Sequence, residues 1–180
     1  MAKFEAVKRM CDGDKIGVNP PIRATANSAG YDFKVCEQTL VPSYWNIMDA
    51  FDGYVAQKVP YDTDSFKAVA KQTGLQPTLV PTGIKCKLDP DEYLQISVRS
   101  STPLNNWLIL ANGVGIIDAD YYGNESNDGE IFFQIINLSP VDIILRPGDK
   151  IGQGIIMKYN TTEDDAASGT RTGGFGSTGN

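Results

Sequence analysis

The chain has 180 residues, of which 18 are glycine, 10 are proline and none is histidine, and its net charge is −6. The acidic balance argues against a nucleic-acid-binding surface, and the absence of histidine excludes every catalytic scheme or metal site that needs an imidazole. The frequent glycines and prolines, with a hydrophobic fraction of 41%, predict one mainly β domain with its own core.

Three cysteines, Cys11, Cys36 and Cys86, have the spacing of neither a zinc site nor a disulfide framework. Three reduced thiols in a cytoplasmic protein are therefore expected. No apolar run is long enough to cross a membrane as a helix. Neither a membrane nor a nucleic acid is expected as a partner.

The first half of the chain predicts short strands that are interrupted by an insertion. We expect a strand over residues 3–10, a loop over 11–21, and a strand that begins near Asp32 and runs to about Val41. Residues 43–77 differ in character, because aromatic side chains stand among acids and amides, and they predict an insertion with at least one short helix. Its aromatic residues pack on their own domain, cover a site or contact another subunit.

The β pattern resumes after the insertion. Apolar runs predict strands over 79–88, 93–98 and 131–136, followed by a strand, a Pro-Gly turn and another strand over 143–157. Gln153 lies midway along the last of these strands.

The stretch 109–123 carries the most unusual pattern of the chain. Asn112 and Gly113 mark a turn between two apolar runs, which predicts a β-hairpin. Asp118 follows directly after two isoleucines, and a carboxylate beside apolar side chains is either paired or used in chemistry. Asp118 is therefore either an ordinary turn residue or a functional group.

Arg99 is followed by two hydroxyl residues, Ser100 and Ser101, at the end of a predicted strand. Such a group can hold a phosphate or another oxyanion, although Arg-Ser-Ser also occurs in ordinary loops.

Residues 160–180 show no periodicity and end in a glycine-rich tail that cannot fold alone. The tail is either a disordered linker or an arm that closes over a ligand. In an arm, the amides and Arg171 suit an anion, and Phe175 suits stacking on a flat ring.

Five stretches resemble, in order, the five motifs of the trimeric dUTPases (deoxyuridine triphosphate nucleotidohydrolases). They are residues 29–33, 99–101, 112–123, 147–153 and 171–179. One departure is Gly152 in the fourth stretch, where the family usually has alanine.

The resemblance implies an all-β, jelly-roll-like β-barrel with a short helical insertion at about 43–77. The β domain would span residues 1–159, and residues 160–180 would form a flexible C-terminal arm. The resemblance also implies a homotrimer with shared active sites, in which the arm of one chain closes over a neighbouring site.

The implied activity is hydrolysis of dUTP to dUMP and pyrophosphate. Asp118 would activate the water that attacks the α-phosphorus, and Asp32 would hold Mg²⁺ through a water. Tyr121 would pack against the deoxyribose, and Phe175 would stack on the uracil. The implied substrate-binding residues are Arg99, Ser100, Ser101, Asn112, Gly115, Ile116, Ile117, Tyr121, Gln153, Arg171, Phe175, Gly176 and Ser177.

Two alternatives stay open. A dCTP deaminase of the same fold would carry a catalytic glutamate on the strand after the third motif, where this chain has Gln134. A dUTPase-fold regulator would instead bind another protein, through the insertion.

Overall fold

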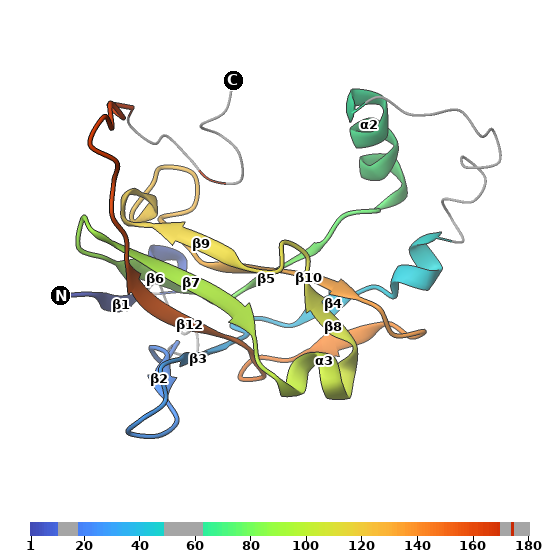
Figure 1. Cartoon of the computed structure of the whole chain (residues 1–180). Helices are drawn as coiled ribbons and strands as arrows, with labels where there is room; N and C mark the ends of the chain where they lie inside the picture. Colours follow the sequence, from blue (N-terminus) through green and yellow to red (C-terminus); the bar gives the residue numbers. More distant parts are fainter. Residues whose placement is uncertain (11–17, 49–62, 170–173, 175–180) are drawn as a thin grey trace.

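The structure is a computed structural model that describes residues 1–10, 18–48, 63–169 and Gly174 (Figure 1). The elements in chain order are β1 (Lys3–Ala6), η1 (Lys8–Met10), β2 (Ile22–Arg23), β3 (Tyr31–Lys34), β4 (Thr39–Val41), α2 (Thr63–Thr73), β5 (Thr78–Pro81), β6 (Ile84–Lys87), β7 (Glu92–Val98), α3 (Ser101–Asn106), β8 (Leu108–Leu110), β9 (Gly115–Asp118), η2 (Ala119–Tyr121), β10 (Phe132–Asn137), β11 (Ile143–Leu145) and β12 (Lys150–Lys158). Strands dominate, so the prediction of a mainly β fold is confirmed.

Two larger sheets form the framework of the molecule. One has five strands in the order β2-β3-β12-β7-β9, and the other has three in the order β5-β10-β8. The pairs β1-β6 and β11-β4 complete the described strands, and all of these named pairings are antiparallel. Figure 1 shows β12 and β7 lying side by side, and their pairing extends over seven residue pairs.

Two strands of the first half are shorter than the sequence predicts. The strand expected over residues 3–10 ends at Ala6 and is followed by the 3-10 helix η1. The strand expected from Asp32 to about Val41 is divided into β3 and β4, which lie in different sheets. The chain leaves β3 where the amide of Val35 donates to a carbonyl of the turn before β12.

The apolar run 79–88 is likewise divided, into β5 and β6. At the break Gly83 has a φ of +68°, and the hydroxyl of Thr82 donates to the carbonyl of Ile131 over 2.7 Å. The backbone therefore turns although the apolar pattern continues, which is why the pattern did not reveal the break.

The predicted turn at Asn112 and Gly113 is confirmed, but the predicted hairpin is wrong. The amide of Gly113 donates to the carbonyl of Leu110 over 2.9 Å, and Gly113 has a φ of +69°. The two arms do not pair with each other, because β8 pairs with β10 whereas β9 pairs with β7. Gly115 permits this contact, since a Cβ atom there would lie 2.6 Å from Cγ1 of Ile96 in β7.

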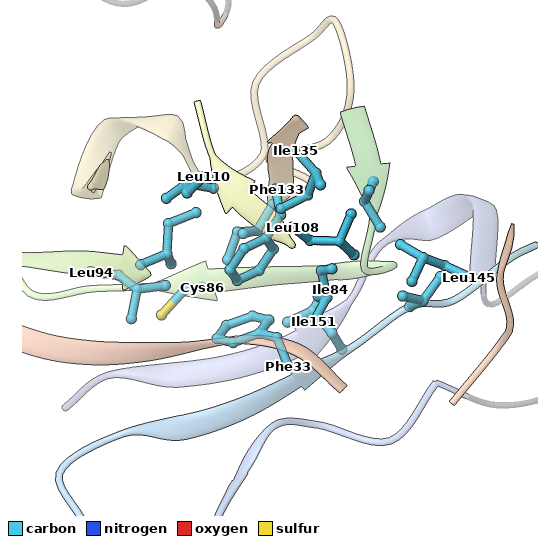
Figure 2. Packing of buried hydrophobic residues seen from close by; sticks show 14 of the residues in the cluster. Phe33, Ile84, Cys86, Leu94, Leu108, Leu110, Phe133, Ile135, Leu145 and Ile151 are labelled. Atoms are coloured by element: carbon cyan, nitrogen blue, oxygen red, sulfur yellow. The ribbon is translucent and has the colours of Figure 1, made fainter. Parts of the chain in front are cut away.

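The hydrophobic core lies between the two larger sheets (Figure 2). Phe33 of β3 and Phe133 of β10 meet there with ring centroids 5.7 Å apart, and both rings are fully buried. Leu94 and Ile151 pack in the same cluster from β7 and β12, and Leu108 joins them from β8. This contact between aromatic rings joins the sheet of β3 to the sheet of β10.

Only one face of strand β10 is buried, although the run 131–136 is almost entirely apolar. Its residues alternate, and Phe133, Ile135 and Asn137 are buried. Phe132 and Gln134 belong to the opposite, partly exposed face. One face of β10 therefore completes the core, and the other is available to a site.

The insertion contains the helix that the sequence predicts. Residues 44–48 are helical, and α2 ends before Gly74, whose φ is +73°. The indole of Trp45 donates to the carbonyl of Leu138 over 3.0 Å, which ties the start of the insertion to the strand β10 region. Among the described residues, no helix is long and apolar enough to span a membrane.

Two of the three cysteines lie in the described part of the chain, and both are free thiols there. Burial raises the pKa of the Cys86 thiol to about 12, and burial also raises the pKa of Cys36. Cys11 lies outside the described residues.

The packing around Gly152 explains why this chain has glycine where the fourth dUTPase motif usually has alanine. A Cβ atom at this position would lie 2.0 Å from Cε1 of Phe133 and 2.6 Å from the carbonyl oxygen of Ser97. Because Phe133 fills the centre of the core, the ring occupies the space that an alanine methyl would need.

We expect Gly152→Ala to lower the free energy of unfolding by about 1–3 kcal/mol, the usual cost of overpacking a core. Phe133→Leu in the same chain should recover part of this loss, because the smaller side chain vacates the contact. Denaturant unfolding of the two single variants and the double variant measures the coupling. Gly169→Ala is the control, since a Cβ atom there meets nothing within 4 Å. Strictly additive losses would contradict the explanation.

Candidate active site

A pocket of about 180 Å³ opens beside the turn between β8 and β9. Six of the substrate-binding or catalytic residues expected from the sequence lie in its wall. The full lining is Ile96, Leu110, Asn112, Gly115, Ile116, Ile117, Asp118, Tyr121, Phe132 and Gln134. Sequence reasoning did not name Ile96, Leu110 or Phe132 as site residues, and it named Gln134 only for the deaminase alternative. The polar Gln134 within the apolar run 131–136 was the signal that one face of this strand borders a site.

The failure of β8 and β9 to pair gives this pocket its chemistry. Each is the last strand of its sheet among the described strands, so each has one backbone edge without a strand partner. Backbone N–H and C=O groups along such an edge can pair with a planar polar ligand. Apolar side chains of both sheets surround these groups, and the pocket therefore suits a flat ring with polar atoms on its rim.

Asp118 stands at the end of β9 and lines the pocket. It also occupies the N-cap position of η2, but its carboxylate makes no cap hydrogen bond. The side chain is half-buried. A role as an ordinary capping residue therefore does not account for Asp118, and its place in the pocket wall favours the functional interpretation.

A second group of predicted site residues gathers around Asp32 of β3. The Asp32 carboxylate lies 3.1 Å from Nε of Arg99 and 2.7 Å from Nζ of Lys150. Gln153 of β12 is the register partner of Asp32, and a Cβ atom on Gly30 would lie 2.6 Å from its Oε1. The cluster thus combines one carboxylate, two cations and an amide, which is a plausible composition for binding phosphates with a cation.

The structure does not bring the two groups together within one chain. Asp118 stands opposite Tyr93 in the pairing of β9 with β7, whereas Arg99 follows the other end of β7. Arg99 is six positions after Tyr93, and at a rise of about 3.3 Å per residue this separation is about 20 Å. Asp118 and Arg99 of one chain therefore belong to different ends of the sheet.

The remaining predicted site residues are only partly described. Ser100 is exposed before α3, and Ser101 is the first residue of that helix. Arg171, Phe175, Gly176 and Ser177 lie outside the described residues.

One described residue of the tail, Gly174, lies against the pocket. A Cβ atom on Gly174 would lie 2.7 Å from Cε2 of Tyr121, so the tail backbone contacts the face or edge of that ring. This contact brings one point of the predicted arm to the pocket wall.

The loop that follows η2 is tied to the opposite side of the molecule through Asp128. Its carboxylate accepts hydrogen bonds from Nζ of Lys85 at 2.9 Å and from the amide of Lys8 at 2.8 Å. Burial by itself raises the pKa of the Asp128 carboxyl, but these bonds outweigh it, and the net shift is downward. Asp128 has a φ of +58°, a conformation that asparagine also tolerates.

The pocket between two strand edges suits a flat ring, and the separate cationic cluster suits an anion. The family model described as dUTPase matches residues 55–179. The deoxyuridine 5'-triphosphate nucleotidohydrolase of Lactococcus lactis subsp. lactis is 33% identical over 165 residues, which are 91% of this chain and 89% of that protein. The chain belongs to the dUTPase family.

Solved structures agree with this assignment. The dUTPase of Streptococcus mutans is 30% identical and superposes with a TM-score of 0.65, over 89% of this chain and 98% of that one. A mutant dUTPase from phage phi11 of S. aureus, described with a structural Mg(II) ion, is 14% identical and has a TM-score of 0.58 over 94% and 97% of the two chains. The second likeness concerns the fold alone.

We expect Asp128→Asn to lower the thermal unfolding midpoint at pH 7, and the difference from the wild type to shrink in acid. The pKa of Asp128 is lower in the folded state than in the unfolded state. Its contribution to the free energy of unfolding is therefore complete above the unfolded-state pKa of about 3.9, and it is lost as pH falls through the folded-state pKa. Unfolding midpoints between pH 7 and pH 3 measure this.

The matched control is Asp91→Asn, which breaks an exposed pair with Lys158 and should change the midpoint less. If the difference in unfolding midpoint between the wild type and Asp128→Asn stayed constant down to pH 3, the charge of Asp128 would not be the cause of that difference.

Proposed function

We propose that this protein hydrolyses dUTP to dUMP and pyrophosphate in sites that are shared between the chains of a homotrimer. The activity follows from membership in the dUTPase family. The observation that carries the shared site is the separation of Asp118 from Arg99 along β7. A single triphosphate needs both the base that activates water and the groups that hold phosphate, so the two halves come from different chains.

The pocket beside β9 takes the uracil ring. Backbone groups along the outer edge of β9 pair with the polar edge of uracil, and Asn112 adds a side-chain amide. Cytosine exchanges donor and acceptor at N3 and at the C4 substituent, so it leaves buried groups unpaired there and is rejected. Phe175 of the arm stacks on the exposed face of the ring.

Tyr121 provides the wall for the sugar. Its ring is buried, with 6% of its surface exposed, and it stands in the same pocket as Asp118. A 2′-hydroxyl on the sugar would be pressed against this ring, so deoxyribose fits and ribose does not.

The cluster around Asp32 takes the triphosphate. Arg99 and Gln153 contact phosphate oxygens, together with Ser100 and Ser101, and Arg171 and the arm residues Gly176 and Ser177 close over them. Their combined positive charge and donors offset the charge of the substrate.

The residues present fit a magnesium ion in this cluster. Mg²⁺ is usually held by one or two carboxylates with substrate phosphates and waters, and this cluster offers the carboxylate of Asp32 beside the groups that bind phosphate. Asp32 is the carboxylate that would hold the ion, through a water. When bound, Mg²⁺ neutralises charge on the phosphate oxygens.

Asp118 orients a water in line with the bond between the α-phosphorus and the oxygen that leaves with pyrophosphate. The water oxygen forms the new bond to phosphorus, the phosphorus–oxygen bond to pyrophosphate breaks, and the Asp118 carboxylate takes the proton. Catalysis consists mainly of positioning and electrostatic stabilisation.

The deaminase alternative has less support. Gln134 lines the pocket where such an enzyme carries its glutamate. A neutral amide cannot accept a proton as a general base does. The insertion as a contact for a regulatory protein partner stays a prediction.

We expect Asp118→Asn to keep the affinity for a non-hydrolysable dUTP analogue and to slow turnover steeply. The substitution preserves size and removes only the charge, and general-base help is worth about 10²–10⁴-fold. Single-turnover rates and dissociation constants, measured for both proteins, separate chemistry from binding. A variant within about tenfold of the wild-type rate would remove Asp118 from this role, and Asp120 would be the next carboxylate to test.

Two inactive variants should restore activity when they are mixed. Asp118→Asn and Arg99→Gln each damage a different half of the site, so random mixed trimers should contain about a quarter of intact sites. Co-refolding at equal amounts, followed by a dUTP assay, measures this recovery. An active monomer, or no recovery on mixing, would contradict the shared site.

The same design identifies the donor of the arm. A chain truncated before Arg171 should complement Asp118→Asn if the arm closes over a neighbouring chain's β9. It should fail to do so if each arm closes over its own chain, in the direction that the contact of Gly174 with Tyr121 indicates.

A further inference from the structure

The hydroxyl of Tyr121 is held on two sides. It donates to the carbonyl of Glu130 over 2.9 Å, and it accepts from Nδ2 of Asn127 over 2.7 Å. The hydroxyl hydrogen of Tyr121 is therefore already used in a hydrogen bond, and one lone pair of its oxygen accepts another. A ribose hydroxyl that approached this group would find no donor from it, and the ring presents mainly carbon to the sugar.

The amide of Asn127 is itself oriented by its neighbours. Its Oδ1 accepts from Nδ2 of Asn124 at 2.8 Å and from the amide of Gly129 at 3.0 Å. Exchanging the oxygen and nitrogen of this amide would set donors against donors, so Nδ2 must face the hydroxyl of Tyr121.

The side chain of Asn124 hydrogen-bonds both to Asn127 and to the backbone of Tyr121. Its Nδ2 also donates to the carbonyl of Tyr121 at 2.9 Å, and its Oδ1 accepts from the amide of Asn127 at 3.2 Å. The backbone and the hydroxyl of Tyr121 are thus fixed by two side chains of one loop.

The far side of this loop is anchored to the N-terminal segment. Asp128 accepts from Lys85, and Glu130, with 1% of its surface exposed, pairs with the guanidinium of Arg9 and accepts from the amide of Gly83 at 2.9 Å. Because the loop is fixed at these points, the position of Asn127 does not simply follow that of Tyr121.

We propose that Asn127 is a positioning residue that sets the discrimination between dUTP and UTP, by fixing the Tyr121 ring where a 2′-hydroxyl would lie. This inference rests on the proposed function. Removal of the Asn127 amide frees the ring to move away from the sugar, so the ribonucleotide gains access while the deoxyribonucleotide loses little.

The test compares kcat/KM for dUTP and for UTP in Asn127→Leu, which removes the amide and nearly preserves its size. The ratio of the two values should fall about tenfold, the loss expected for one hydrogen bond of about 1.4 kcal/mol. The turnover of dUTP should stay within about threefold of the wild type. Glu125→Gln, an exposed change in the same loop, should leave the ratio unaltered.

Tyr121→Phe removes this hydrogen bond from its other end, together with the bond to the carbonyl of Glu130, and serves as the second variant, including where Asn127→Leu fails to fold. It should lower the ratio by a similar factor, and Asn127→Leu should have no further effect in the Tyr121→Phe chain. If Asn127 had only a structural role, its substitution would instead lower kcat/KM for dUTP and for UTP by the same factor, in the wild-type chain and in the Tyr121→Phe chain.

The outcomes separate the two proposals. A wild-type protein that does not hydrolyse dUTP would overturn the proposed function and this inference with it. A wild type that prefers dUTP, with an unchanged ratio in Asn127→Leu or in Tyr121→Phe, would overturn the role of Asn127 alone.

Discussion

The backbone hydrogen bonds of β7, to β12 on one side and to β9 on the other, hold the Asp118 end and the Arg99 end of the described site apart. Strand β12 pairs with β7 on one edge and with β3 on the other, where Gln153 is the register partner of Asp32, and the end of β7 brings Arg99 to the same carboxylate. The pairing with β9 places Asp118 at the other end of the sheet. Because hydrogen-bonded strands cannot slide without reversing their faces, one chain cannot bring these two groups together. The proposal of a site shared between chains rests on this separation.

The pocket exists because two strands that adjoin in sequence join different sheets. The turn at Gly113 directs β8 toward β10 and β9 toward β7, so both strands keep one unpaired edge. An unpaired edge is normally a liability, since it invites pairing with another chain. Here the edges border a cavity with apolar walls, where a planar ligand with polar atoms can satisfy them.

The core and the site share residues of the same strands. Phe133 of β10 holds the two larger sheets together, while Phe132 and Gln134 on the other face of β10 line the pocket. Gly152 shows how tightly these demands are coupled, because the ring of Phe133 leaves no room for a methyl group there. Interiors packed at this density transmit a change at one residue to its neighbours. Substitutions in β10 should therefore be considered for stability and for binding together.

The sequence by itself determined the mainly β character, the turn at Gly113, the short helix of the insertion and six of the residues that line the pocket. These are local properties, set by turn chemistry, side-chain alternation and the identity of polar groups. Tertiary structure alone decided which strands pair, so the expected hairpin is absent and three expected strands are divided or shortened. It also decided that Asp32 meets Lys150 and that Asn127 meets Tyr121. Pairings between strands far apart in the chain depend on the packing of all of them at once, and no local pattern records that.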